Sequence, residues 1–129
     1  MKQNTHLKID TKLCGEVLAL EDSYAKVALV CTIEMAADEE GLVHGGFIFG
    51  AADFAAMCAV NVPHVVLTAS SCRFMAPSRV GDLIEFEARL EELLAPKGSV
   101  EVIGKCGDKT VFSGTFKTYI TDTHVLKGS

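Results

Sequence analysis

The feature that most constrains the fold of this chain is one nearly unbroken apolar stretch, "HGGFIFGAADFAAMCAVN", from His44 to Asn61. Its five alanines favour a helix, and apolar residues occupy nearly every side of that helix, which predicts burial rather than a surface position. Asp53 is the one acidic residue in the stretch. A buried carboxylate must be partnered, neutralised or placed at a cavity where its charge is used. The alternative is a helix that exposes one edge and carries Asp53 there.

The rest of the chain alternates between apolar and polar residues with the period of two that indicates half-buried strands. The predicted strands cover residues 16–20, 24–34, 65–75, 82–94, 100–105 and 111–121. Turns are predicted at "APKG" (95–98) and at "CGDK" (106–109), where Gly107-Asp108 forms the tip of a tight hairpin. The order strand, strand, helix and four strands predicts an α+β fold whose antiparallel sheet curls around the buried helix.

Length and composition restrict the class of protein. A chain of 129 residues with 49% hydrophobic residues is expected to form one domain, 1–129, with a sizeable core. A formal net charge of −5 argues against nucleic-acid binding. No apolar run approaches the roughly 20 residues of a membrane span, and the first residues lack a signal-peptide core, so a cytoplasmic location is expected. Five widely spaced cysteines and four scattered histidines predict neither a disulfide framework nor a metal site.

Two glycines open the predicted helix. Without side-chain cover, the backbone N–H groups of Gly45 and Gly46 are available at the positive end of the helix dipole, where they can bind an anion or stabilise an oxyanion; an ordinary turn is the alternative. Gly45 precedes Asp53 by eight residues, which is about 12 Å along a helix. That is too far for both groups to reach one carbonyl, so a catalyst built on them is expected to be a homodimer with shared sites.

Two segments carry a family resemblance. "GLVHGGFIFGAADFAAMCAVN" resembles the signature of hotdog-fold acyl-CoA thioesterases of the phenylacetate-pathway (PaaI) type, which is HGG, six residues, Asp, then small apolar residues and often Asn. "SCRFMAPSRVGDLIEFEARL" is similar to the family's strand-Pro-x-x-x-Gly-Asp segment, matched by Pro77, Gly81 and Asp82. The resemblance covers roughly residues 15–121. It implies a hotdog fold, in which a curved antiparallel sheet wraps one long central helix.

The resemblance also implies an activity, hydrolysis of the thioester bond of a coenzyme A substrate. Asp53 would be the nucleophile or general base, and the Gly45 N–H of the opposing subunit would polarise the carbonyl. His44 would fix the turn or the thioester, with a helix-capping role as the alternative. A hydroxyl after the helix would orient water; the candidates are Thr68, Ser70 and Ser71, and Ser71 is preferred. Coenzyme A is part of the substrate, so no cofactor is implied.

The substrate-binding residues expected from the resemblance lie on the predicted helix, at its end, or on the strand and turn that follow it. They are Gly46, Phe47, Phe54, Asn61, Thr68, Met75 and Arg79. Arg79 is expected to meet coenzyme A phosphates. Where relatives often carry Asn or Gln, this chain has Asp38, which we interpret as part of a solvated acidic turn. The sequence does not indicate whether such dimers pair further into tetramers.

Two other functions compete with the thioesterase. One is a non-catalytic hotdog protein that binds or senses acyl-CoA, since the same fold serves both roles. The presence of Asp53 favours the enzyme. The other is a hotdog dehydratase, which would need a catalytic His paired with Asp or Glu, and no placement of such a pair is evident. The acyl group and the pathway are not indicated by the sequence.

Overall fold

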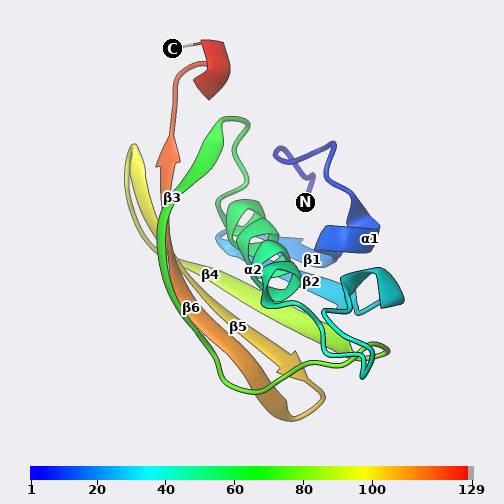
Figure 1. Cartoon of the computed structure of the whole chain (residues 1–129). Helices are drawn as coiled ribbons and strands as arrows, with labels where there is room; N and C mark the ends of the chain where they lie inside the picture. The colour runs from blue at the N-terminus through cyan, green and yellow to red at the C-terminus, as the bar shows by residue number, and fades with distance from the viewer. Residues whose placement is uncertain (128–129) are drawn as a thin grey trace.

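A six-stranded sheet curls around one long helix in the computed structural model, which describes residues 1–127 (Figure 1). The helices are α1 (Thr11–Cys14) and α2 (Gly45–Val60), with short 3-10 turns η1 (Ile33–Met35) and η2 (Val125–Lys127). The strands are β1 (Glu16–Glu21), β2 (Tyr24–Val30), β3 (Val65–Phe74), β4 (Leu83–Leu94), β5 (Lys97–Cys106) and β6 (Lys109–Ile120). Their order in the sheet is β1-β2-β4-β5-β6-β3, and every neighbouring pair is antiparallel. The predicted α+β hotdog fold is confirmed.

Helix α2 lies in the concavity of the sheet, against β2, β4 and β5 (Figure 1). Ten of its 16 residues are buried, which confirms the prediction of a buried helix. Its alanines allow the helix to approach the sheet closely, while the sheet supplies the fully buried rings of Phe86, Phe112 and Phe116. Within residues 1–127, none of the helices is both long and apolar enough to cross a membrane.

Two predicted strand boundaries differ from the structure by three residues or more. The strand predicted at 24–34 ends at Val30, because Cys31 turns into the loop after it and exchanges backbone hydrogen bonds with Gly81 (2.7 Å) and Asp82 (2.8 Å). The strand predicted at 100–105 begins three residues earlier, at Lys97, because Leu94 and Lys97 are already paired across a two-residue loop. The hairpin predicted at 106–109 is confirmed by the pairing of Cys106 with Lys109.

Strand β3 lies at one edge of the sheet, with β6 on one side and no strand from residues 1–127 on the other (Figure 1). Its register with β6 places Ser70 opposite the buried Phe116 and Phe74 opposite the buried Phe112. Residues directly opposite each other share a face of the sheet, so Ser70 and Phe74 lie on the concave, helix-facing side. A bulge between Leu67 and Ala69 sets this alternation.

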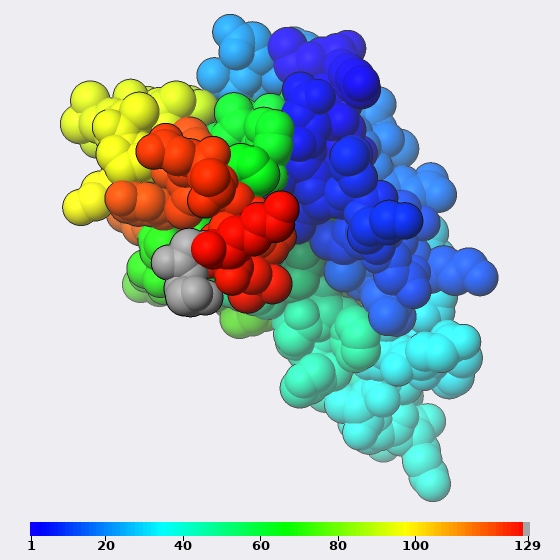
Figure 2. All heavy atoms as spheres, turned by 90° about the horizontal axis from the view of Figure 1, so that it is seen from above, coloured from blue at the N-terminus to red at the C-terminus, as the bar shows by residue number. Residues whose placement is uncertain are grey.

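The N-terminal segment, residues 2–14, was not predicted to have a defined structure. It runs across α2 on the side that the sheet leaves open and ends in α1, which packs against α2 (Figure 1). Seen from above, its first residues lie beside the C-terminal residues of the chain (Figure 2). Gly15 then leads into β1 with φ 98°, in close contact with β2, where a Cβ atom would lie 2.6 Å from Val27.

Candidate active site

Asp53 is half-buried near the middle of α2. Its Oδ1 atom is buried and has no hydrogen-bond partner among residues 1–127. Burial raises the pKa of this carboxyl from 3.8 to about 6, because removal from water disfavours the charged form. Asp53 thus lies between the two predicted alternatives, since its side chain is half-buried and its Oδ1 atom is buried. A proton-accepting group with this pKa and no partner of its own is typical of a functional carboxylate.

Helix α1 brings Cys14 close to Asp53. The pKa of the Cys14 thiol is raised first by its burial and then by the negative charges of Asp10 and Asp53. The thiol therefore stays neutral at physiological pH, and it places no second negative charge next to Asp53. A short helix that the sequence patterns did not reveal therefore packs against α2 and brings a thiol within electrostatic range of Asp53.

The start of α2 presents uncapped backbone amides. His44 occupies the N-cap position with φ −63° and ψ 130°, but its side chain makes no capping hydrogen bond. Its exposed ring instead packs edge-on against Phe47, with 6.2 Å between the ring centroids. The predicted alternative of a capping histidine is therefore wrong. The N–H groups of Gly45 and Gly46 thus receive no capping hydrogen bond from His44, which leaves them as candidate donors to a ligand.

Two loops hold this helix start in place. The His44 N–H donates to the Met35 carbonyl at 2.9 Å, and the Val43 N–H donates to the Ser78 carbonyl at 2.9 Å. The loop that carries Ser78 and Arg79 therefore lies beside the HGG motif, and the Arg79 side chain is exposed there. The two sequence segments that carry the family resemblance thus meet in space through Val43 and Ser78, which are 35 positions apart in the chain.

Exposed apolar side chains lie next to the helix start. Phe74 and Met75, at the end of β3, are 52% and 57% exposed. A Cβ atom on Gly45 would lie 3.6 Å from the Phe74 ring, which places that ring directly beside the Gly45 backbone. The structure thus brings Met75, Arg79 and the HGG motif to one end of the molecule, with an apolar surface around the free amides.

Other predicted site residues lie elsewhere. Phe54 is only 2% exposed and belongs to the core, where it touches the N-terminal segment through a 6.3 Å ring contact with His6. Asn61 lies at the opposite end of α2 from Gly45, and its side chain is bonded to Lys2 and Asn4. The expectation that Phe54 and Asn61 contact substrate stays a prediction. Asp38 is exposed and accepts hydrogen bonds from two amides of its own turn.

The register of β3 also contradicts the preference for Ser71. This residue is paired with Thr115, on the convex face that points away from α2. Ser70 is the serine on the helix-facing side. Thr68 lies in the bulge, and its hydroxyl donates to the Lys117 carbonyl at 3.2 Å. The physical reason for the error is that one extra residue in a strand exchanges the two faces for every residue that follows.

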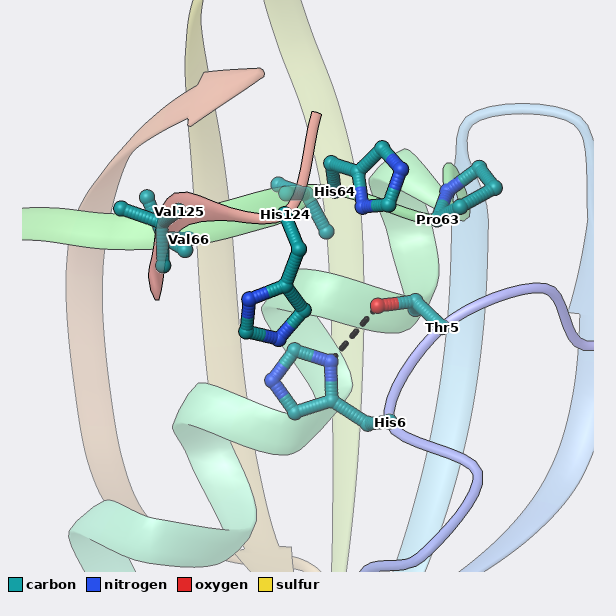
Figure 3. A pocket seen from close by; sticks show the side chains of 8 residues that line it. Thr5, His6, Pro63, His64, Val66, His124 and Val125 are labelled. Carbon is teal, nitrogen blue, oxygen red and sulfur yellow. Dashed lines mark hydrogen bonds between the residues drawn. The ribbon is translucent and has the colours of Figure 1, made fainter. Parts of the chain in front are cut away.

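Three histidines gather in a separate small cavity of about 260 Å³ beyond the C-terminal end of α2 (Figure 3). His6 comes from the N-terminal segment, His64 precedes β3, and His124 follows β6. The rings of His64 and His124 are 6.3 Å apart, and Thr5 bonds to His6 at 2.7 Å. In the described part of the chain, no group of His, Cys, Asp or Glu side chains is placed to hold a metal ion. Sequence spacing gave no sign of this cavity, since its histidines lie about 60 residues apart.

The fold and the motif at the start of α2 define a hotdog protein of the thioesterase type. The chain belongs to the thioesterase superfamily, whose sequence profile matches residues 40–113. The crystal structure of an uncharacterized protein from Pyrococcus horikoshii is 43% identical, covers 98% of this chain and 97% of its own, and superposes with a TM-score of 0.96. A variant of the phenylacetic acid degradation protein PaaI from Thermus thermophilus is 25% identical over 84% of this chain and 95% of its own, with a TM-score of 0.78. The predicted likeness to PaaI is confirmed.

Curated relatives are longer than this chain. Methylthioribose-1-phosphate isomerase of Aquifex aeolicus is 45% identical over 118 residues, which are 92% of this chain and 26% of the relative. The transcription factor FapR of Bacillus cereus is 25% identical over 121 residues, which are 92% of this chain and 61% of FapR. The chain therefore spans about a quarter of the first relative and three fifths of the second.

Proposed function

We propose that this chain is an acyl-CoA thioesterase whose active site is completed by a second copy of the chain. The observation that carries the proposal is the half-buried Asp53 carboxylate, whose buried Oδ1 atom has no hydrogen-bond partner among the described residues, on the helix whose start offers the uncapped Gly45 amide. Membership of the thioesterase superfamily supports hydrolysis of a thioester, and the match of the motif to PaaI-type enzymes supports coenzyme A as the thiol.

In the proposed reaction, ionised Asp53 accepts a proton from a water molecule while the water oxygen attacks the thioester carbonyl carbon. Direct attack by the carboxylate, followed by hydrolysis of the anhydride, is the variant of this mechanism. The carbonyl oxygen gains negative charge, which the Gly45 N–H stabilises. The tetrahedral intermediate then expels the coenzyme A thiolate, and the proton held by Asp53 returns to solvent or to the thiolate. A pKa of about 6 makes Asp53 largely ionised at neutral pH while it remains a better base than an ordinary carboxylate.

The proposed partner is an identical chain, joined through β3. This strand has ten residues and an open edge, which is an unpaired row of backbone donors and acceptors. Antiparallel pairing of two β3 edges about a two-fold axis would extend the sheet and bring the two α2 helices side by side. The exposed Phe74 and Met75 would then be covered, and the Gly45 amide of one chain would face the Asp53 of the other.

The proposal is tested by a pair of variants at Gly45. Gly45→Pro removes the N–H while keeping the helix, because proline is favoured at the first helical position and the backbone of His44 already has the extended conformation that a following proline requires. Gly45→Ala keeps the N–H and adds only an ordinary contact with Phe74.

Free-thiol release from a panel of acyl-CoAs is the assay. We expect kcat to fall by about 100- to 1000-fold in Gly45→Pro and to stay within a few-fold of wild type in Gly45→Ala. Asp53→Asn is expected to be inactive. Equal activity of the two Gly45 variants would remove the amide from the mechanism, and a fully active monomer in light scattering would remove the shared site.

A second candidate function is acyl-CoA binding without turnover. The similarity to the transcription factor FapR along nearly the whole of this chain favours it. The two functions differ in one measurement, since a sensor would bind acyl-CoA in a calorimeter and release no thiol. Asp53 favours the enzyme, because a binding site has no need of a carboxylate that destabilises the fold.

A further inference from the structure

Asn61 joins the end of α2 to the N-terminal segment. It adopts the left-handed conformation, with φ 55° and ψ 45°, and its N–H donates to the Met57 carbonyl at 2.8 Å. Both the oxygen and the nitrogen of its side-chain amide form hydrogen bonds. The Asn4 N–H donates to Oδ1 at 2.7 Å, and the Nδ2 group donates to the Lys2 carbonyl at 2.9 Å. Asn61 is 57 positions from Asn4 and 59 positions from Lys2 in the sequence. Its side chain therefore acts as a clamp on the N-terminal segment.

From this clamp the N-terminal segment follows α2 back to Asp53. Thr5 is 3% exposed, and the His6 ring lies 6.3 Å from the ring of Phe54, the residue next to Asp53. Ile9 then packs against the core, as does Cys14 in α1, whose thiol is close enough to interact with the Asp53 charge. The N-terminal segment thus contacts α2 at Asn61, again at Phe54, and finally through α1.

We propose that Asn61 is a positioning residue for Asp53, because by clamping residues 2–4 it holds the N-terminal segment over α2 and limits the access of water to the carboxylate. This inference concerns the site of the proposed thioesterase and rests on that function for its catalytic consequence. A segment with few buried contacts opens locally at a lower free-energy cost than the core does. Loss of the clamp therefore loosens the segment and hydrates Asp53.

The groups around Asp53 fix the direction of the effect. Facing it from α1 is the neutral thiol of Cys14, with the negative charge of Asp10 beyond. On Asp53 itself burial is the one cause of the shift, and no neighbouring charge among the described residues contributes to it. With no countercharge among these groups to lose, hydration is the change that matters. It favours the ionised form, so the pKa of Asp53 is expected to fall from about 6 toward 3.8.

Three variants isolate the clamp. Asn61→Gly removes both side-chain hydrogen bonds and keeps the left-handed turn, which glycine adopts without strain. Deletion of residues 2–4 removes the other half of the contact and leaves Asn61 in place. Asn61→Asp keeps an oxygen that can accept from the Asn4 N–H, and it is the conservative variant expected to retain a partial effect. If Asn61→Gly folds poorly, the deletion variant still decides the question.

Two readouts are measured on the full protein. The acid limb of the pH profile of kcat/KM is expected to move down by about one pH unit or more in Asn61→Gly and in the deletion variant, with no further shift when they are combined. The Asp53 carboxyl, assigned through Asp53→Asn, is also titrated directly by ¹³C NMR and is expected to shift likewise.

An unchanged Asp53 midpoint in both clamp variants would overturn the inference and leave Asn61 a structural residue. Absence of thiol release by the wild type, together with a shifted NMR midpoint, would refute the proposed function and leave the control of Asp53 by Asn61 intact. The two failures are therefore distinguishable.

Discussion

Replacing Asp53 by Asn is expected to inactivate the protein and, at the same time, to stabilise it. The folded state holds the Asp53 proton more tightly than the unfolded chain, because its pKa is raised from 3.8 to about 6. The cost of the charge is therefore absent below the unfolded pKa and complete above the folded one. At about 1.4 kcal/mol for each pH unit, the full cost is roughly 3 kcal/mol. Residual solvent around the half-buried side chain reduces it, so we expect about 1–3 kcal/mol at pH 8 and about 0.5 kcal/mol or less at pH 4.

The assay is urea unfolding followed by circular dichroism at both pH values, with protein concentration fixed because a dimer's stability depends on it. The difference between the two pH values is the informative quantity, since the desolvation of the new amide is the same at both. Asp38→Asn is the matched control; it keeps an oxygen acceptor for the turn, and Asp38 is exposed. A stabilisation that is equal at pH 8 and pH 4, or a loss of stability at pH 8, would refute the reasoning.

Two glycine substitutions test the packing around the sheet and helix. Gly104→Ala places a Cβ atom 2.8 Å from the Phe86 ring and 3.2 Å from Phe112, so we expect a loss of about 1–3 kcal/mol in unfolding free energy, and an unchanged melting temperature would contradict it. Gly50→Ala meets no atom within 4 Å and lies inside α2, so we expect a gain of about 0.5–1 kcal/mol. Calorimetric melting of both variants and the wild type measures the expected loss of stability in the first and the expected gain in the second.

How far the sequence predicts this structure depends on the range of the interactions involved. The helix and the six strands follow from local periodicity, and their predicted centres agree with the structure. The N-terminal segment does not, because its anchors are contacts between Lys2 or Asn4 and Asn61, and between His6 and Phe54, which no local pattern encodes.

The predicted site likewise has residues that local patterns reveal and residues whose placement depends on distant contacts. Asp53 and Gly45 stand out in the sequence because a charge in an apolar helix and a Gly-Gly at its start are local anomalies. The choice between Ser70 and Ser71 depends on a one-residue bulge near Thr68, which alternation along the chain cannot reveal. For Asn61 the family pattern gives the position but not the hydrogen bonds to Lys2 and Asn4, which join segments far apart in the chain.

The continuity of α2 from Gly45 to Val60 has a genetic consequence under the proposed arrangement. Each chain gives its carboxylate to one site and its amide to the other. In a hybrid dimer of Asp53→Asn and Gly45→Pro chains, both lesions fall in the same site and the second site is intact. Two inactive alleles are then expected to complement each other when expressed together.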